Sequence, residues 1–257
     1  MHDLGDLSHC LGWVITRDRQ NRQLFISQEH YIESYLKELN LQEITTYSSP
    51  ADPEITYCKA MCPNSDSEKL KMDKLPFKSL LGRAIGNCTR LDIVTAINEM
   101  VRYAANPGMD HWNGLLRIFG HLKKTSNFGL CFENPRDDAP DGLHGFVDAS
   151  LSRCLDTRKS RYGGAFINHG GAVDWATKIT STIPQSSMES EYIGACEQAK
   201  TGMWIINCMT ELNLRNEKEP VKIGIYNTSA KMFAENQITN TKSRHIETKF
   251  HYLNSQG

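Results

Sequence analysis

The sequence of 257 residues contains no apolar run close to the roughly 20 residues that a membrane-spanning helix needs, and no signal peptide opens it. We therefore expect no membrane partner. A strong excess of basic residues is also missing, because the formal net charge is −1. Dedicated nucleic-acid-binding proteins are usually basic, so a role of that kind must depend on local patches of positive charge.

The sequence also lacks cysteines and histidines at the spacing of a zinc site. Eight cysteines are scattered along the chain, only Cys58 and Cys62 are close together, and no matching Cys/His pair accompanies them. Several cysteines lie in apolar runs, as reduced core thiols do, which indicates a cytoplasmic or nuclear location. Hydrophobic residues at 39% and charged residues at 23% are ordinary globular values, which argues against wholesale disorder.

The front half predicts an α+β segment with a hairpin and helices. A long polar stretch that contains three prolines interrupts it, and we interpret this stretch as an exposed connector. In chain order we predict strands at 11–16 and 22–27, a helix after Ser27, the connector at 45–74, helices near 93–104 and 112–124, and a strand at 128–133.

The second half alternates strand and helix after a polar stretch at 134–141, which we interpret as a domain boundary. We therefore predict two domains, 1–135 and 136–257, the second an α/β domain with a mixed sheet. Its predicted elements are strands at 143–149, 164–168, 172–176 and 221–226, a long helix at 188–212, a short helix at 229–235, and a final helical segment from His245.

Carboxylates at the ends of these elements suggest a metal site. Asp148 ends the first strand of the second half, Glu191 lies at the start of the long helix with Glu189 nearby, and Glu247 lies in the final segment. Magnesium prefers hard oxygen ligands, and two-metal phosphodiester hydrolysis uses acidic side chains that converge on two cations about 4 Å apart. The position at the end of the fourth strand, where another acid would be expected, is occupied by Tyr226.

The chain resembles the C-terminal part of the Pol polyprotein of copia-type LTR retrotransposons nearly end to end. Residues 1–133 resemble the segment that follows the catalytic palm of the reverse transcriptase, and residues 144–254 resemble the ribonuclease H domain. The first resemblance is carried by Asp3 to Leu7, Leu11-Gly12, Ile15 to Asp18, Ser27-Gln28, Tyr31-Ile32, Leu81-Gly82, Thr89 to Ile93, Asn106 to Gly108, His111-Trp112 and Leu122 to Ser126. The second is carried by Asp148-Ala149, Thr157 to Ser160, Ser186 to Tyr192, Asn227 to Ala230 and His245 to Glu247.

This resemblance implies that Asp148, Glu191 and Glu247 are catalytic, metal-binding carboxylates of a ribonuclease H-like domain. The cofactor would be Mg²⁺ or Mn²⁺, and the partner an RNA–DNA hybrid or another nucleic acid. Glu191 is preferred to Glu189 because Tyr192 after it fits the helix pattern of the family, which leaves Glu189 as an acid favoured by the helix dipole. Lysines and arginines that could contact phosphates are Lys178, Lys231, Lys242, Arg244 and Lys249.

Tyr226 departs from the family pattern, because it stands where the family has the aspartate of an Asp-Asn pair. A phenol is neutral at physiological pH and a poor ligand for magnesium, and we expect its ring to occupy space that a cation needs. Glu247 stands where an aspartate is usual. The family's polymerase aspartates precede the segment that matches Met1, so we expect a fragment cut at both ends, without a palm and without polymerase activity.

Three hypotheses follow from these features. The first is a fragment of Pol whose ribonuclease H centre is impaired by Tyr226. The second is a working ribonuclease H that cleaves the RNA strand of hybrids despite Tyr226. The third is a domesticated, non-catalytic module that binds nucleic acid or full-length retrotransposon proteins.

Overall fold

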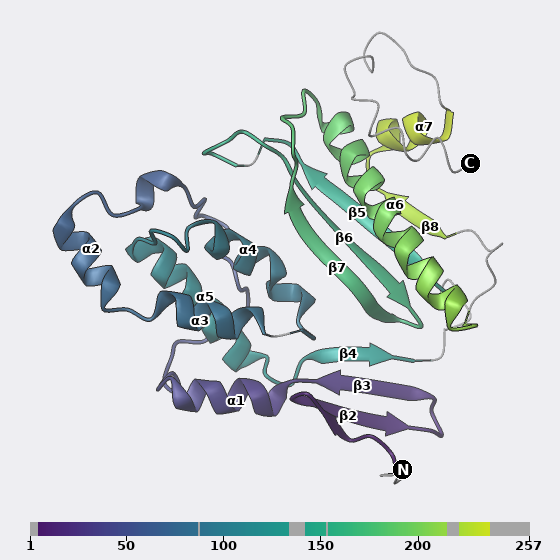
Figure 1. Cartoon of the computed structure of the whole chain (residues 1–257), viewed down its shortest axis with the longest axis horizontal. Helices are drawn as coiled ribbons and strands as arrows, with labels where there is room; N and C mark the ends of the chain where they lie inside the picture. The colour runs from purple at the N-terminus through teal and green to yellow at the C-terminus, as the bar shows by residue number, and fades with distance from the viewer. Residues whose placement is uncertain (1–4, 87, 134–141, 153, 215–220, 237–257) are drawn as a thin grey trace. The chain divides into compact units, whose positions relative to one another are not determined.

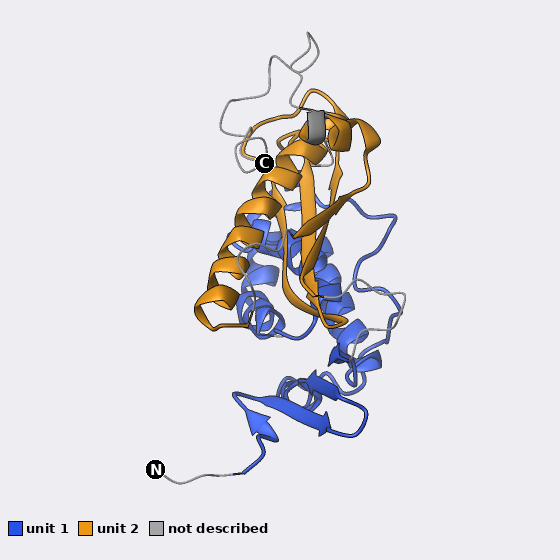
Figure 2. Ribbon diagram, turned by 90° about the vertical axis from the view of Figure 1, so that its right-hand side faces the viewer, with its two compact units in different colours: residues 1–134 blue, residues 135–257 orange. Residues whose placement is uncertain are grey.

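The computed structural model describes residues 5–86, 88–133, 142–152, 154–214 and 221–236. Two compact units divide the chain, residues 1–134 and residues 135–257 (Figure 2). Each unit contains one sheet and its own helices (Figure 1). The mixed α and β content that we predicted is confirmed. The assignment of the units to a polymerase segment and a ribonuclease H-like domain stays a prediction.

Unit 1 begins with an antiparallel sheet in the order β1-β2-β3-β4, formed by His9–Cys10, Trp13–Asp18, Gln23–Ser27 and Gly129–Phe132. The predicted hairpin is confirmed as β2 and β3, which pair from Val14 with Ser27 to Asp18 with Gln23. The strand predicted near residue 128 is confirmed as β4, which pairs with β3.

The core of unit 1 is helical. The helices are α1 (Glu29–Glu38), α2 (Asp66–Asp73), α3 (Phe77–Ile85), α4 (Val94–Arg102) and α5 (Met109–Lys124), with 3₁₀ turns at Lys59–Met61 and Leu91–Ile93. Helices α1, α3, α4 and α5 each present one apolar face to this core, so that Tyr35, Leu80, Ile97, Ile118 and Phe119 are buried. Because removing apolar side chains from water is the main stabilising term of folding, these faces hold unit 1 together.

The prediction of an exposed connector at 45–74 is wrong for part of that stretch. Helix α2 forms there, and Ser65 and Glu68 close a capping box at its start. Met72 and Tyr57 are buried. Helix α2 buries only Met72, so hydrophobic periodicity carried no information about it. The spacing of Ser65 and Glu68 was the available signal.

A buried ionic cluster connects the end of α5 to the turn before α4. Arg90 is only 1% exposed, and its Nε and Nη2 donate to the two carboxylate oxygens of Asp92 at 2.9 and 2.7 Å. Its Nη1 donates to the carbonyl of Thr125 at 2.9 Å, and Nε2 of His121 lies 2.8 Å from Asp92. Burial raises the pKa of Asp92, but hydrogen bonds and positive charge from Arg90 and His121 more than offset this, so the pKa lies below its ordinary value.

Unit 2 contains a sheet in the order β7-β6-β5-β8, formed by Gly171–Ile179, Arg161–Asn168, His144–Ser150 and Lys222–Ile225. Strands β5, β6 and β7 are antiparallel, whereas β8 runs parallel to β5. The predicted mixed sheet is therefore confirmed. The predicted hairpin between β6 and β7 also forms, with His169 and Gly170 at positive φ as a tight turn requires.

Two helices accompany this sheet, α6 (Ser187–Glu211) and α7 (Thr228–Asn236). Both were predicted within a few residues of these bounds, whereas the segment predicted from His245 lies outside the described residues. Glycine allows α6 to approach the sheet closely. A Cβ at Gly194 would lie 3.0 Å from Tyr162, and one at Gly202 would lie 2.8 Å from the Phe166 ring. This close contact fixes the position of the side chains on the first turns of α6.

Candidate functional site

Asp148 lies near the end of β5, the strand between β6 and β8. Its Cα pairs with that of Gly163 on β6, and its neighbour Val147 pairs with Ile225 on β8. Val147 is buried beneath α6, and Asp148, the next residue along the pleat, is exposed. The strand thus fixes the backbone of Asp148 while its carboxylate stays accessible from solvent.

Glu191 lies in the second turn of α6, and the sequence around it explains its position. Ser186 caps the helix, because its Oγ accepts from the N–H of Glu189 at 3.1 Å. Tyr192, Ile193 and Cys196 bury the inner face of the helix. Glu191 is carried on this inner face, so its side chain is only 4% exposed.

The carboxyl groups of Glu191 and Asp148 meet. The Glu191 carboxyl group lies within hydrogen-bonding reach of the Asp148 side chain and of the backbone N–H of Ala149. Burial is the largest cause that raises the pKa of Glu191 to about 7, and the negative charge of Asp148 is the second. The Oε2 atom of Glu191 is buried and has no hydrogen-bond partner in the described structure. A buried polar atom of this kind costs free energy unless a ligand or solvent satisfies it.

Glu189 has a different role from Glu191. Its Oε2 accepts from the backbone N–H of Gln185 at 2.7 Å, at the positive end of the helix dipole. The structure therefore separates the two acids: Glu191 faces Asp148, and Glu189 stabilises the start of the helix. The role of Glu191 as a metal ligand stays a prediction.

Tyr226 directly follows β8, next to Asp148 on the neighbouring parallel strand, since the last aligned pair is Val147 with Ile225. Its side chain is 89% exposed. The ring therefore packs against little of the described part of unit 2. That it occupies space that a cation needs stays a prediction. What Tyr226 changes at this position is the charge, since a carboxylate would add a third negative group there.

The other predicted site residues are either exposed on this unit or not described. Glu247 lies outside the described residues, as do Lys242, Arg244 and Lys249. Lys178 on β7 and Lys231 on α7 are exposed. Within the described residues, no group of three or more His, Cys, Asp or Glu side chains is placed to hold a metal ion. The described part of the site therefore consists of two acids and no more.

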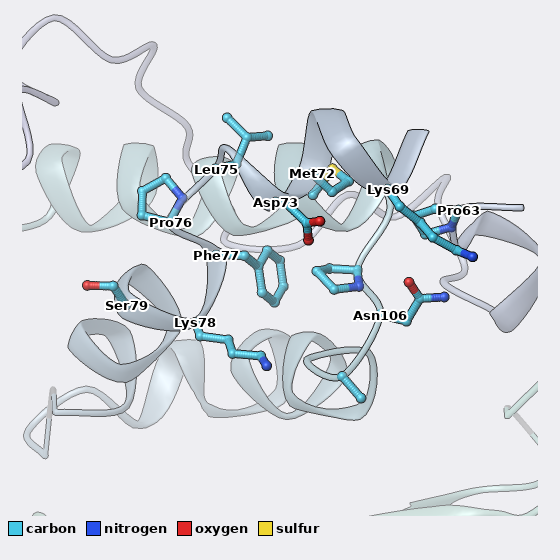
Figure 3. A pocket seen from close by; sticks show the side chains of 12 residues that line it. Pro63, Lys69, Met72, Asp73, Leu75, Pro76, Phe77, Lys78, Ser79 and Asn106 are labelled. Atoms are coloured by element: carbon cyan, nitrogen blue, oxygen red, sulfur yellow. The ribbon is translucent and has the colours of Figure 1, made fainter. Parts of the chain in front are cut away.

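A separate cavity of about 360 Å³ lies in unit 1, between the end of α2, the start of α3 and the 105–107 turn (Figure 3). Its walls combine apolar side chains such as Met72 and Phe77 with Lys69, Lys78 and Asp73. Neither Asp148 nor Glu191 contributes to it. The candidate acidic site of unit 2 is thus separate from this cavity.

Two further features hold across the described residues. Across the described residues, no helix combines the length and apolar character of a bilayer span. All eight cysteines lie in the described ranges, and none of them forms a disulfide.

Comparison with known proteins identifies homologues along nearly the whole chain. The retrovirus-related Pol polyprotein from transposon TNT 1-94 of Nicotiana tabacum is 34% identical over 255 residues, which are 98% of this chain and 19% of that protein. The corresponding proteins from transposons RE2 and RE1 of Arabidopsis thaliana are 26% and 24% identical, over 98% and 99% of this chain and 16% and 17% of their own length. This chain therefore spans less than a fifth of these relatives. No protein-family model and no solved structure matches it.

Proposed function

We propose that this chain is a fragment of a copia-type retrotransposon Pol polyprotein in which unit 1 is the thumb and connection of the reverse transcriptase and unit 2 is a ribonuclease H-like domain. Homology to three Pol polyproteins of plant transposons over 98% or more of the chain supports its origin from a Pol polyprotein. The meeting of Asp148 and Glu191 carries the functional assignment.

We further propose that unit 2 binds RNA–DNA hybrids but cleaves them poorly. Asp148 and Glu191 would hold Mg²⁺ or Mn²⁺ together with Glu247, and the buried, unpartnered Oε2 of Glu191 fits such a role. When bound, the cation would activate water and stabilise the leaving oxygen. The two acids would orient the hydrolytic centre, while Tyr226 supplies no charge where the family pattern has an aspartate.

Hybrid cleavage by a set of matched variants tests this function. The purified chain is given a labelled RNA–DNA hybrid with Mg²⁺ or Mn²⁺, alongside Tyr226→Asp, Tyr226→Asn and Asp148→Asn. We expect cleavage by Tyr226→Asp to exceed that of the unmodified chain by at least about 100-fold, on the scale that oriented electrostatic groups contribute. Tyr226→Asn removes the ring without adding charge, so it should stay as inactive as the unmodified chain.

Efficient cleavage by the unmodified chain that Asp148→Asn abolishes would instead establish a working ribonuclease H. A Tyr226→Asp variant that binds hybrid but remains inactive would contradict the idea of a single disabling substitution. Saturable hybrid binding without cleavage by any variant would favour the non-catalytic module.

A further inference from the structure

The loop at 151–160 joins β5 to β6 at the end of the sheet that carries Asp148. Asp148 pairs with Gly163 and Ser150 pairs with Arg161, so strand β5 ends two residues beyond the acid and the loop follows it toward β6. Figure 1 shows the two strands that the loop joins. From these pairings and the extended length of a residue, Arg158 lies within about 20 Å of Asp148. That distance corresponds to roughly six base-pair steps of a nucleic-acid duplex.

Buried and partly buried hydrogen bonds hold the two ends of this loop. The N–H of Ser152 donates to Oγ of Ser160 at 3.0 Å, and the N–H of Ser160 donates to Oγ1 of Thr180 at 3.2 Å. Ser160 and Thr180 are 0% and 2% exposed. Further along, the N–H of Arg158 donates to the carbonyl of Cys154 at 2.8 Å. These bonds hold the backbone at Ser152, Arg158 and Ser160.

Two residues of the loop adopt the left-handed region although they are not glycine. Ser152 has a φ of 50° and Arg158 a φ of 57°. Side chains with a Cβ are disfavoured there, and glycine is the residue that relieves the strain. A long, charged side chain at position 158 thus costs stability, which directs attention to what that side chain does.

The loop also presents positive charge without neutralising it. Arg158 is exposed and Lys159 is half-buried, and within the described residues neither forms an ion pair. Asp156, the acid of the loop, is half-buried and already engaged in an interaction. The described residues of the loop therefore carry two cationic side chains close in sequence to the end of the strand that bears Asp148.

We infer that Arg158 and Lys159 bind backbone phosphates of the nucleic-acid strand whose neighbouring segment reaches Asp148 and Glu191. This inference rests on the proposed function, which supplies the RNA–DNA hybrid as the ligand. It adds the phosphate contact that positions the hybrid at the two acids. The guanidinium of Arg158 can engage two oxygens of one phosphate, and the ammonium of Lys159 contributes a point charge.

Equilibrium binding to a fluorescently labelled RNA–DNA hybrid in EDTA, where no cleavage occurs, tests the contact. The full chain is compared with Arg158→Gly, Arg158→Lys and Lys159→Gln at several salt concentrations. We expect Arg158→Gly to weaken binding about 10-fold at 50 mM salt and to reduce the salt slope by about 1, as the loss of one phosphate contact requires. Arg158→Lys keeps the charge but loses the two-pronged geometry, so it should leave the salt slope unchanged and weaken binding less than Arg158→Gly does.

Lys222→Gln provides the matched control, since Lys222 is exposed on β8 and aligns with His144 at the opposite end of β5. It should change binding by less than about 2-fold. Arg158→Gly should also raise the melting temperature by about 3 °C, because glycine relieves the strain at φ 57°. That rise shows that weaker binding does not come from misfolding.

The inference would be overturned if Arg158→Gly and Lys222→Gln lost affinity for the hybrid equally. It would also be overturned if Arg158→Gly bound the hybrid as tightly as the unmodified chain. In either case hybrid binding by the unmodified chain would leave the proposed function intact. An unmodified chain that does not bind the hybrid at 50 mM salt would overturn both.

Discussion

The two units place buried charge in opposite ways. In unit 1, Arg90 is surrounded by acceptors, and Asp92 receives hydrogen bonds from both Arg90 and His121. In unit 2, two acids face each other, and an oxygen of Glu191 lacks a hydrogen-bond partner in the described structure. In the cluster of unit 1 each buried charge has its partner, so removing one member leaves another uncompensated. The like-charge pair of unit 2 is compensated only when a proton or cation joins it.

Replacing Arg90 should have the largest effect of the changes that probe this comparison. Arg90→Met leaves Asp92 without its main partner and the Thr125 carbonyl without a donor. We expect unit 1 to lose about 3 kcal/mol of unfolding free energy, as the breaking of buried ion pairs does. Urea unfolding followed by circular dichroism measures this loss.

Arg83→Met serves as the control for this change, because Arg83 pairs with Glu38 at a largely exposed site. Its cost should stay below about 1 kcal/mol. Comparable costs for the two variants would mean that the buried cluster is no more important than a surface ion pair.

Glu191→Gln should raise the stability of unit 2 instead of lowering it, because it removes the repulsion between the carboxylates of Glu191 and Asp148. At pH 8 we expect the variant to be more stable than the unmodified chain by about 1–2 kcal/mol, the scale of one unsatisfied buried group. The folded pKa of about 7 lies above the ordinary value of 4.5, so the folded chain binds the extra proton between these pH values. The stability of the unmodified chain therefore falls as the pH rises from about 4.5 to 7, and the advantage of the variant should vanish at pH 5.

Glu189→Gln provides a control on the same helix with the same chemical change. It weakens the charged hydrogen bond from Gln185 and the favourable interaction with the helix dipole, so it should lower stability at pH 8. Stability changes of opposite sign in the two variants would support the distinction between Glu189, which stabilises the helix start, and Glu191, which is buried against a like charge. A Glu191→Gln variant that loses stability at pH 8 would contradict it.

Much of the architecture could be predicted because local patterns determine it. The stripes of α4, α5 and α6 and the alternation of β5 reflect which face each element buries. The contact between Asp148 and Glu191 was inferred through the family resemblance, since residues 43 positions apart carry no local signal of contact. The exposure of Tyr226 and the burial of Arg90 depend on neighbours remote in sequence. The polar helix α2 escaped prediction because it buries so little.

Bound magnesium should compensate the like-charge pair of unit 2, as Arg90 and His121 compensate Asp92 in unit 1. A cation at Asp148 and Glu191 would take the place of the missing partner. With a dissociation constant of about 1 mM, 10 mM Mg²⁺ at pH 8 should stabilise unit 2 by about 1.4 kcal/mol. At pH 5 the protonated Glu191 competes with the cation, and the gain should disappear. Thermal unfolding with Mg²⁺, measured beside Glu191→Gln, tests this effect. An equal gain in Glu191→Gln would assign the cation to another site.

The two serine caps offer the finest comparison between the units. Ser186 caps α6 and Ser65 caps α2, through similar bonds of 3.1 and 3.3 Å to the third residue of each helix. Helix α6 carries buried residues along its length, whereas α2 buries only Met72.

Ser186→Ala should therefore cost about 1 kcal/mol of global stability, and Ser65→Ala less than about 0.5 kcal/mol, because α2 can open locally without unfolding the core. Hydrogen exchange separates the two cases: Ser65→Ala should speed exchange in α2 alone, and Ser186→Ala should speed it throughout unit 2. Faster exchange across unit 1 in Ser65→Ala would show that α2 is integral to its core.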